Sequence, residues 1–416
     1  MRFLSEWWNK TDKTERNIQA LTFLLTFAIC TYQSAFVSIV MGLAGVYIIA
    51  DCIKTKGIRG FASDRECWLG IAVFLFSVVL SSLMLGDGGS LRIAFNYVYW
   101  ALPYFLIVYF QKQADIKYAV LLGVCACILL DGIYTGYQYA LLLQGAKQIS
   151  QSGRIELFYG HPNAYAMFLT AMLPLPMFAL KDHLLKKLKH FVCADFFLIG
   201  LGLWSLLKSG SRGAFGGLVV GFILVFLLYC YNNKSLKKFL AGLVVCVSVS
   251  GLLSTFMVGG MQRRYDTERF LLFQSSYAMW QDHKLLGVGL NNWATEYQKK
   301  YIMKQAKERR LDVPHNTIAW FFTTTGVVGG AGYLFFVMYY PVLLCRKISM
   351  ETIRERWVLY AVLLSFLAVN IHGMVDVGLT HKGIARLLYL MLGLALTCTI
   401  SCNALGRDRN EGGCGM

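Results

Sequence analysis

Apolar residues occur along the chain in long, nearly uninterrupted runs that are separated by polar segments. A run of about 17 to 25 apolar residues lets an α-helix cross a bilayer core of ~30 Å. The runs do not alternate apolar with polar positions, so they favour helices over the strands of a membrane barrel. The pattern predicts about twelve membrane-spanning helices, near residues 18–34, 36–53, 67–86, 93–110, 117–142, 164–180, 191–207, 213–231, 236–258, 316–345, 357–374 and 383–402.

Composition agrees with this interpretation. Of the 416 residues, 56% are hydrophobic and 15% are charged, and the mean hydropathy is +0.52. A soluble domain has about a quarter of its residues charged. We therefore expect an all-α, polytopic membrane protein in which residues 1–416 form one transmembrane domain.

The net charge of +17 raises the question of a nucleic-acid partner, but its distribution indicates membrane topology instead. Basic residues gather in alternate loops, as the positive-inside rule requires of cytoplasmic segments. The basic start and tail fall on the same side, so both termini are expected in the cytoplasm. The basic loops are 54–59, 111–117, 181–190, 232–238 and 346–356.

The longest polar segment, residues 259–314, breaks this rule. The topology places it outside, yet it carries ten Lys or Arg residues. Within it, Phe270, Phe273, Tyr277 and Trp280 follow a helical spacing. An amphipathic helix at the outer membrane boundary, with basic neighbours near phosphate head groups, is one interpretation. A solvated basic loop near anionic lipid is the other.

Two features follow on this outer segment. Gly287 and Gly289, in "LLGVGLNNW", indicate a turn or a close backbone approach. In "VPHNTIAW", Pro314 ends the loop, and His315 or Asn316 can cap the helix that re-enters the membrane.

Polar residues collect near the predicted outer ends of the helices. A charge at the bilayer centre costs ~2.5–3.5 kcal/mol, so such groups should face protein or a wet cavity. One carboxyl, Asp131, is predicted at mid-depth, where a transport pathway and a satisfied structural group are both open. The outer set comprises Arg154, His161, Asn163, Arg212, Arg269, His315, Asn316, His372 and Asp376.

Residue chemistry suggests roles for some of this set. Arginine presents a rigid fork of donors that matches phosphate, so Arg212 and Arg269 can hold a lipid-linked diphosphate. Arg212 also begins a predicted helix, whose free N–H groups favour an anion. His315 is the first candidate to take a proton from an attacking hydroxyl, and His161 is the second. Helix capping and snorkelling explain the same residues without catalysis.

Several stretches together resemble the O-antigen ligase and polymerase superfamily over about residues 150–380. "SGSRGAFGG" is similar to its Ser-Arg-Gly-Ala helix start, and "ERFLLFQSSYAMWQDHKLLGVGLNNW" to its outer-loop segment. "PHNTIAWFFTTTGVVGG" resembles its His-Asn helix start, and "GHPNAYA" its Asn-containing segment before that half. The chain departs from the family at Lys284, where a proline is frequent, and at Thr323, Thr324 and Thr325, where a Glu is frequent.

The resemblance implies a membrane glycosyltransferase of the GT-C type that uses an undecaprenyl-diphosphate-linked glycan, without cofactor or metal and with inversion. It implies that Arg212 and Arg269 bind the donor diphosphate and that His315 activates or orients the acceptor hydroxyl. We expect the substrate site also to include His161, Asn163, Arg154, Asn316 and Asp376.

We expect the protein in the bacterial inner membrane with its active site facing the periplasm. An O-antigen ligase with a lipid A–core acceptor is the first interpretation. A polymerase of lipid-linked repeat units uses the same donor chemistry and stays open. A polysaccharide or lipid transporter is the alternative from another class.

Overall fold

The structure is a computed structural model that describes residues 12–31, 34–55, 65–144, 154–235, 237, 240–244, 247–248, 262–350 and 356–410. Within these ranges the regular structure is helical. The helices are α2 (Lys13–Cys30), α3 (Ser34–Thr55), α4 (Arg65–Leu85), α5 (Gly88–Trp100), α6 (Leu102–Gln111), α7 (Lys117–Leu143), α8 (Pro162–Met172), α9 (Pro174–Leu185), α10 (Lys189–Ser209), α11 (Arg212–Asn232), α13 (Gln262–Asp282), α14 (Trp293–Glu296), the π-helix η1 (Tyr297–Tyr301), α15 (Thr317–Met350), α16 (Arg356–His372) and α17 (Lys382–Asn410).

Many of these helices are long enough to span a membrane. In the described part of the chain, eight helical segments are long and apolar enough to cross a membrane, and α16 is a shorter apolar helix. Large apolar side chains on α3, α7, α11 and α15 are exposed, as lipid-facing surfaces would be. The expectation of an all-α, polytopic membrane protein is confirmed.

The helices agree closely with the apolar pattern. The predicted segment 236–258 lies largely outside the described residues, and each other predicted segment coincides with one helix or a pair. Three predicted spans are interrupted. Pro103 lies in the first turn of α6 and Pro174 begins α9, where proline is tolerated because those N–H groups need no helical partner. The third break is at Gly326 in α15.

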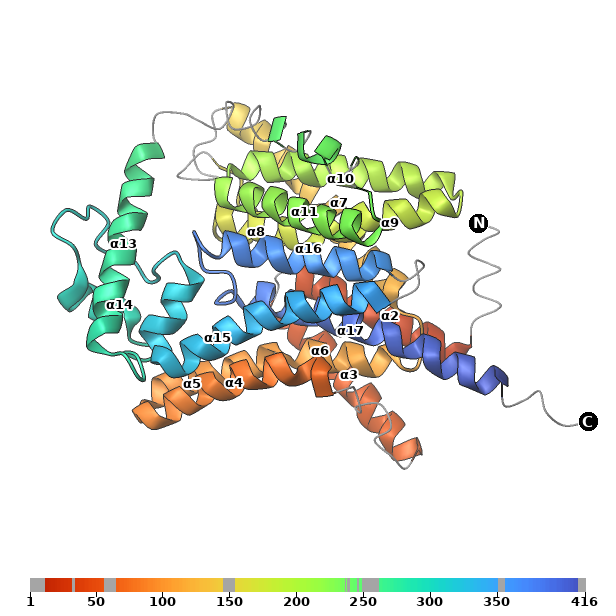
Figure 1. Cartoon of the computed structure of the whole chain (residues 1–416), viewed down its shortest axis with the longest axis horizontal. Helices are drawn as coiled ribbons and strands as arrows, with labels where there is room; N and C mark the ends of the chain where they lie inside the picture. Colours follow the sequence, from red (N-terminus) through yellow and green to blue (C-terminus); the bar gives the residue numbers. More distant parts are fainter. Residues whose placement is uncertain are drawn as a thin grey trace, which may run out of the picture.

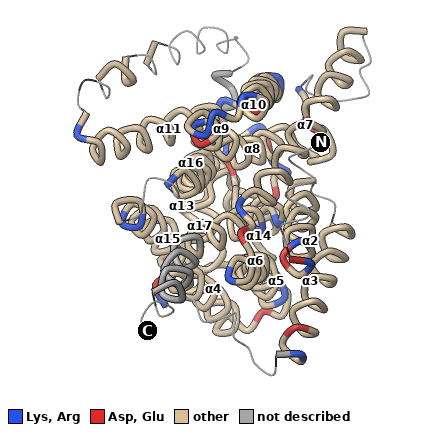
Figure 2. The backbone as a smooth tube through the Cα atoms, turned by 90° about the vertical axis from the view of Figure 1, so that its right-hand side faces the viewer, with Lys and Arg blue, Asp and Glu red and all other residues tan. Residues whose placement is uncertain are grey.

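The long helices run side by side, and α13 crosses one end of the bundle (Figure 1). We call this the α13 end. The start of α2 and the end of α17 lie at the opposite end (Figure 1). Figure 2 looks at that opposite end and shows the basic residues at helix ends and in loops rather than along the helices.

A stripe of glycines brings α11 against α16. Gly213, Gly217 and Gly221 recur every fourth residue on one face of α11. A Cβ at Gly217 would lie 2.5 Å from the carbonyl oxygen of Ala368, and one at Gly213 would lie 2.7 Å from Cδ2 of His372. Small residues at such spacing let two membrane helices approach closely. The contact places the start of α11 beside the end of α16.

The break in α15 receives the loop that follows α13, within the segment 259–314. Gly326 has a φ of 62° and ψ of −159°, so the carbonyls before it are freed from the helix. The N–H of Val288 donates to Thr323 O at 2.9 Å, and the N–H of Gly289 donates to Thr324 O at 2.9 Å. Non-helical backbone near the membrane is tolerated where protein satisfies its polar groups, and here the loop does so.

The two glycines of "GVG" are needed for this docking. Gly287 and Gly289 have positive φ values of 70° and 96°. A Cβ at Gly287 would lie 2.4 Å from the carbonyl carbon of Thr324. The turn and close backbone approach expected from the sequence are therefore confirmed, and they fix the outer segment on α15.

The glycine stripe gives a matched test. We expect Gly217→Ala to lower the apparent melting temperature of the detergent-purified protein, because its Cβ overlaps a backbone oxygen, at a cost of about 1–3 kcal/mol. Gly216→Ala is the control, because no atom lies within 4 Å of its Cβ position, and alanine favours the helix. Equal melting temperatures for the two variants would contradict the proposed packing.

Candidate active site

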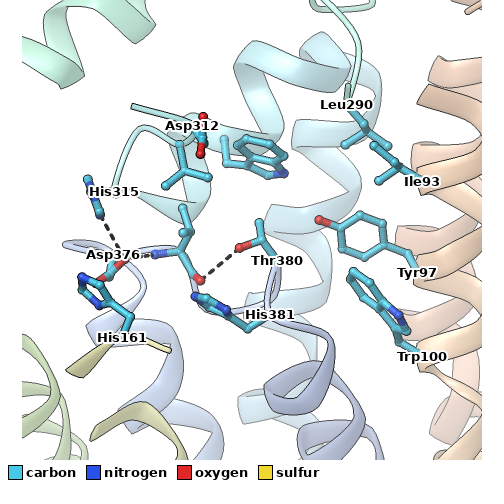
Figure 3. A pocket seen from close by; sticks show the side chains of 13 residues that line it. Ile93, Tyr97, Trp100, His161, Leu290, Asp312, His315, Asp376, Thr380 and His381 are labelled. Carbon is cyan, nitrogen blue, oxygen red and sulfur yellow. Dashed lines mark hydrogen bonds and ion pairs between the residues drawn. The ribbon is translucent and has the colours of Figure 1, made fainter. Parts of the chain in front are cut away.

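Four segments meet at the α13 end of the bundle. They are the stretch before α8, the start of α11, the turn before α15 and the loop between α16 and α17. Each brings residues that the sequence analysis selected, and Figure 3 shows His161, His315 and Asp376 side by side. Residues far apart in the sequence therefore form one site.

The carboxylate of Asp376 lies at the centre of this site. Its Oδ2 accepts a hydrogen bond from Nδ2 of Asn163 at 2.7 Å. Its Oδ1 accepts the N–H of Val377 at 2.9 Å and lies 3.1 Å from Nδ1 of His315. Asp376 is only 5% exposed. A buried carboxylate is stable only when donors surround it, and here three segments supply them.

These donors keep Asp376 ionised. Burial raises the pKa of its carboxyl, but the hydrogen bond and charge of His315, with smaller contributions from His372 and the N–H of Val377, outweigh burial. The net effect places the pKa below its ordinary value. Asp376 is therefore a permanent negative charge beside His315.

His315 is held in an unusual backbone conformation. Its φ is 48°, in the left-handed region, where a residue with a Cβ is uncommon and costs on the order of 1–3 kcal/mol. The turn that imposes this φ directs Nδ1 to Asp376. A carboxylate partner favours the tautomer in which Nδ1 carries the proton. The other ring nitrogen, Nε2, is then left as a base.

The residues that follow His315 fix the turn. Asn316 caps α15, since its Oδ1 accepts the N–H of Ala319 at 2.8 Å and its Nδ2 donates to Met374 O at 2.8 Å. The N–H of Thr317 donates to Gly373 O at 2.7 Å. Of the two cap candidates in the sequence, Asn316 is the one that caps, and it also joins α15 to the loop after α16.

His161 has a different role from His315. It is the N-cap of α8, and its Nδ1 accepts the N–H of Asn163 at 3.2 Å. Desolvation lowers the pKa of its imidazole, despite the nearby charge of Asp376. Neutral His161 therefore has its proton on Nε2. The two histidines therefore hold opposite tautomers: Nε2 of His315 is left as a base, whereas Nε2 of His161 is a hydrogen-bond donor.

Arg154 and Asn163 form a chain of hydrogen bonds that ends at Asp376. Nη2 of Arg154 donates to Oδ1 of Asn163 at 2.8 Å, which orients the Asn163 amide so that Nδ2 faces Asp376. Nε of Arg154 donates to Ser209 O at 2.8 Å, at the C-terminus of α10. Arg154 therefore joins the "KSGSR" turn to the carboxylate, through Asn163.

The two other arginines lie on the α11 and α13 side of the site. Arg212 is the first residue of α11, exposed and next to the N-cap Ser211, whose Oγ accepts the N–H of Ala214 at 3.4 Å. Arg269 is half-buried on α13, close enough to His372 for its charge to act on that imidazole. Within the described residues no hydrogen bond or ion pair engages Arg269, so its guanidinium is available.

His315 and Asp376 also line a cavity of about 490 Å³. The rest of its lining comes from α5, α15, Leu290 in the loop after α13, and the stretches that precede α8, α15 and α17 (Figure 3). Tyr97, Trp100 and Trp320 form an aromatic wall, and His161 and His381 face it. The volume falls within the range of about 300–1,000 Å³ that small-molecule sites occupy.

The sequence analysis missed part of this lining. His381 and Thr380 form "THK" directly before α17, a position equivalent to that of His315 before α15, and this parallel was the available signal. Tyr97 and Trp100 carry no such signal, because aromatic residues in an apolar run are ordinary core residues.

Other candidate groups lie apart from the site. Asp131 is fully buried in α7, where its Oδ2 accepts a hydrogen bond from Tyr159 at 2.9 Å. The Tyr159 hydroxyl oxygen also lies 2.8 Å from Cys30 O, so these contacts join α2, α7 and the stretch before α8. Among the described residues, no group of three or more His, Cys, Asp or Glu side chains has the arrangement that a metal ion requires.

Comparison with known proteins identifies one family. Residues 197–334 match the family model described as O-antigen ligase, and the segment includes Arg212, Arg269 and His315. This match confirms the predicted resemblance to the O-antigen ligase and polymerase superfamily, and it supports a glycosyltransferase-like activity of that type. None of the curated proteins that were compared matches the chain.

The lowered pKa of Asp376 predicts a pH dependence. A carboxyl with a lowered pKa in the folded state contributes stability above its unfolded pKa of about 3.9 and loses it as the pH falls further. We expect the wild type to have a higher melting temperature than Asp376→Asn. This margin should be constant at neutral pH and should shrink below about pH 4. Thermal unfolding in detergent from pH 7 to 3 measures this. A margin that fails to shrink between pH 4 and pH 3 would contradict it.

Proposed function

Because residues 197–334 match the O-antigen ligase family, we propose that this chain transfers a glycan from undecaprenyl diphosphate to a lipid A–core acceptor at the periplasmic face of the bacterial inner membrane. The observation that carries the proposal is the His315–Asp376 pair, which lines an aromatic cavity at the same end of the bundle as Arg269. A base, its orienting carboxylate and a cationic group are the parts that such a transfer requires.

The step follows from these positions. The acceptor hydroxyl oxygen attacks the anomeric carbon of the donor glycan as its proton passes to Nε2 of His315. The bond from that carbon to the diphosphate breaks, and the electron pair leaves with the diphosphate. Attack opposite the leaving group inverts the anomeric centre. Asp376 orients His315 and stabilises its positive charge once it is protonated.

Arg212 and Arg269 act on the leaving group in this proposal. Guanidinium groups match the oxygens of a diphosphate and stay charged, so they stabilise the charge that develops as the bond breaks. Arg212 adds the N–H groups at the start of α11, which favour an anion. Transfer without a metal ion is part of the proposal, since the arginines would carry the electrostatic stabilisation.

The proposed topology has twelve spans with both chain termini in the cytoplasm. Support comes from the basic residues at the end of the bundle opposite α13, which the positive-inside rule assigns to the cytoplasm (Figure 2). The segment 259–314 would then be periplasmic. The fold would be of the GT-C type, and Asn316, His161, Asn163 and Arg154 would serve the substrate site through Asp376 and the turns around it.

Alanine variants test the catalytic assignment. We expect His315→Ala to lower the transfer rate by about 10²–10⁴-fold through loss of the base. Arg269→Ala and Arg212→Ala should each lower it by about 10²-fold or more through loss of leaving-group stabilisation. The assay is glycan transfer by protein reconstituted in liposomes, at matched insertion levels.

The controls separate specific from general charge effects. Lys304→Ala removes one exposed positive charge from the same outer segment and should keep full activity. Arg212→Lys should stay impaired, because a point charge lacks the planar fork. Full activity in all three alanine variants would refute the catalytic assignment.

The product distinguishes the ligase from its relatives. The reconstituted protein is supplied with a lipid-diphosphate glycan, and with lipid A–core in half of the samples. Product on lipid A–core identifies a ligase, and a longer lipid-linked chain identifies a polymerase. Passage of the glycan across the bilayer without a covalent product would favour the transporter.

A further inference from the structure

The lining of the cavity beside His315 includes neither Arg212 nor Arg269. It comes from α5, α15, Leu290 in the loop after α13, and the stretches that precede α8, α15 and α17. Asp376 and His315 belong to this lining (Figure 3). We therefore distinguish an arginine side and a cavity side of the site.

Charge distinguishes the two sides. Among the described residues, the cavity lining includes the carboxylates of Asp312 and Asp376 and no Lys or Arg. A diphosphate placed there would face these negative charges with no cation to offset them. A neutral ligand meets no such penalty, so the cavity does not suit the diphosphate part of a donor.

The aromatic wall of the cavity is suited to bind a sugar ring. Tyr97 and Trp100 lie one helical turn apart on α5, with ring centroids 4.7 Å apart, and Trp320 lines the cavity from α15. Aromatic faces pack against the apolar C–H face of a pyranose, while their polar atoms bind hydroxyl groups. The hydroxyl of Tyr97 points into the cavity (Figure 3).

Its polar groups suit hydroxyls rather than charges. Trp320 is 8% exposed, and its indole N–H lies close to the hydroxyl of Tyr97. Burial lowers the pKa of His381, as desolvation does for His161, so both are neutral near pH 7. A neutral imidazole has one donor and one acceptor. His161 can therefore donate from Nε2, since its Nδ1 already accepts the N–H of Asn163, and such groups suit the hydroxyls of a polyol.

We propose that this cavity binds the acceptor's terminal sugar, with its ring on the wall of Tyr97, Trp100 and Trp320 and one hydroxyl at His315. The inference rests on the proposed transfer reaction, because the donor is assigned there to Arg212 and Arg269. In-line displacement requires the acceptor hydroxyl and the diphosphate to lie on opposite faces of the anomeric carbon, and separate subsites for the acceptor and the diphosphate allow this arrangement. Tyr97 and Trp100 determine acceptor recognition, although they are far from the arginines in the sequence.

Binding of two probes to the purified full-length protein tests this. The probes are delipidated core oligosaccharide, for the cavity, and inorganic pyrophosphate, for the arginine side, both measured by calorimetry. Tyr97→Phe removes only the hydroxyl and should weaken oligosaccharide binding about three- to tenfold. Trp100→Leu should weaken it about tenfold or more. Phe95→Leu, on the lipid-exposed face of α5, is the matched control and should bind normally.

The pyrophosphate probe has the opposite expectation. Its binding should be unchanged in Tyr97→Phe and Trp100→Leu and should be lost in Arg269→Ala, which in turn should keep oligosaccharide binding. In the transfer assay the α5 variants should raise KM for the acceptor by the same factors and leave KM for the donor unchanged.

Three results would overturn the inference: wild-type protein that does not bind the oligosaccharide, equal oligosaccharide affinity in wild type and both α5 variants, or weakened pyrophosphate binding in those variants. Failure of the proposed function is a different result. In that case the wild type binds the oligosaccharide through Tyr97 and Trp100 but transfers no glycan to lipid A–core.

Discussion

The buried carboxylate of Asp376 is the group on which the site depends. It connects segments that are more than two hundred residues apart, because Asn163 donates to one oxygen while Val377 and His315 lie at the other. An uncompensated charge at 5% exposure would cost several kcal/mol, so the fold is stable only when these segments meet. The contact between Asp376 and His315 both stabilises the buried charge and sets the tautomer of His315. The stability of the fold and the protonation of His315 therefore depend on the same contact.

Close backbone contacts bring the segments within reach of that carboxylate. The Gly213–Gly217–Gly221 stripe holds α11 on α16, and the carbonyls before Gly326 accept hydrogen bonds from the outer loop. In both places a single Cβ would overlap backbone atoms. Because apolar burial gives helices little reason to associate in lipid, close packing and satisfied backbone groups carry more of the positioning. Glycines at close contacts therefore position the α13 end, together with aromatic pairs such as Trp280 and Phe322.

The site has different electrostatics on its two sides. An available guanidinium at Arg269 and the helix start at Arg212 favour anions, whereas the cavity has carboxylates, neutral imidazoles and aromatic rings. His315 belongs to the cavity lining. In the proposed reaction, this difference in charge would keep a lipid diphosphate and a neutral sugar from competing for one place.

By itself the sequence determined the class of fold. Membrane helices can be recognised in a sequence as runs of apolar residues, because the side chains of each span face lipid or other helices along its whole length. The apolar runs therefore located the described helices, apart from the breaks before Pro103 and Pro174 and at Gly326, where a local backbone constraint interrupts an otherwise uniform pattern. The choice of Arg154, Asn163, His161, Arg212, Arg269, His315, Asn316 and Asp376 also came from the sequence, because polar groups are rare beside such runs.

Only the tertiary structure decided which contacts each of these residues makes. In sequence, His161 and His315 both precede a helix and look equivalent. The structure shows that Nδ1 of His161 accepts a backbone N–H, whereas Nδ1 of His315 faces a carboxylate, and this difference sets which nitrogen of each ring holds the proton. Likewise, Arg154 supports Asn163 while Arg269 is available, and Tyr97 joins a cavity wall. The physical reason is that hydrogen-bond partners come from segments distant along the chain, so spacing in the sequence carries no information about them.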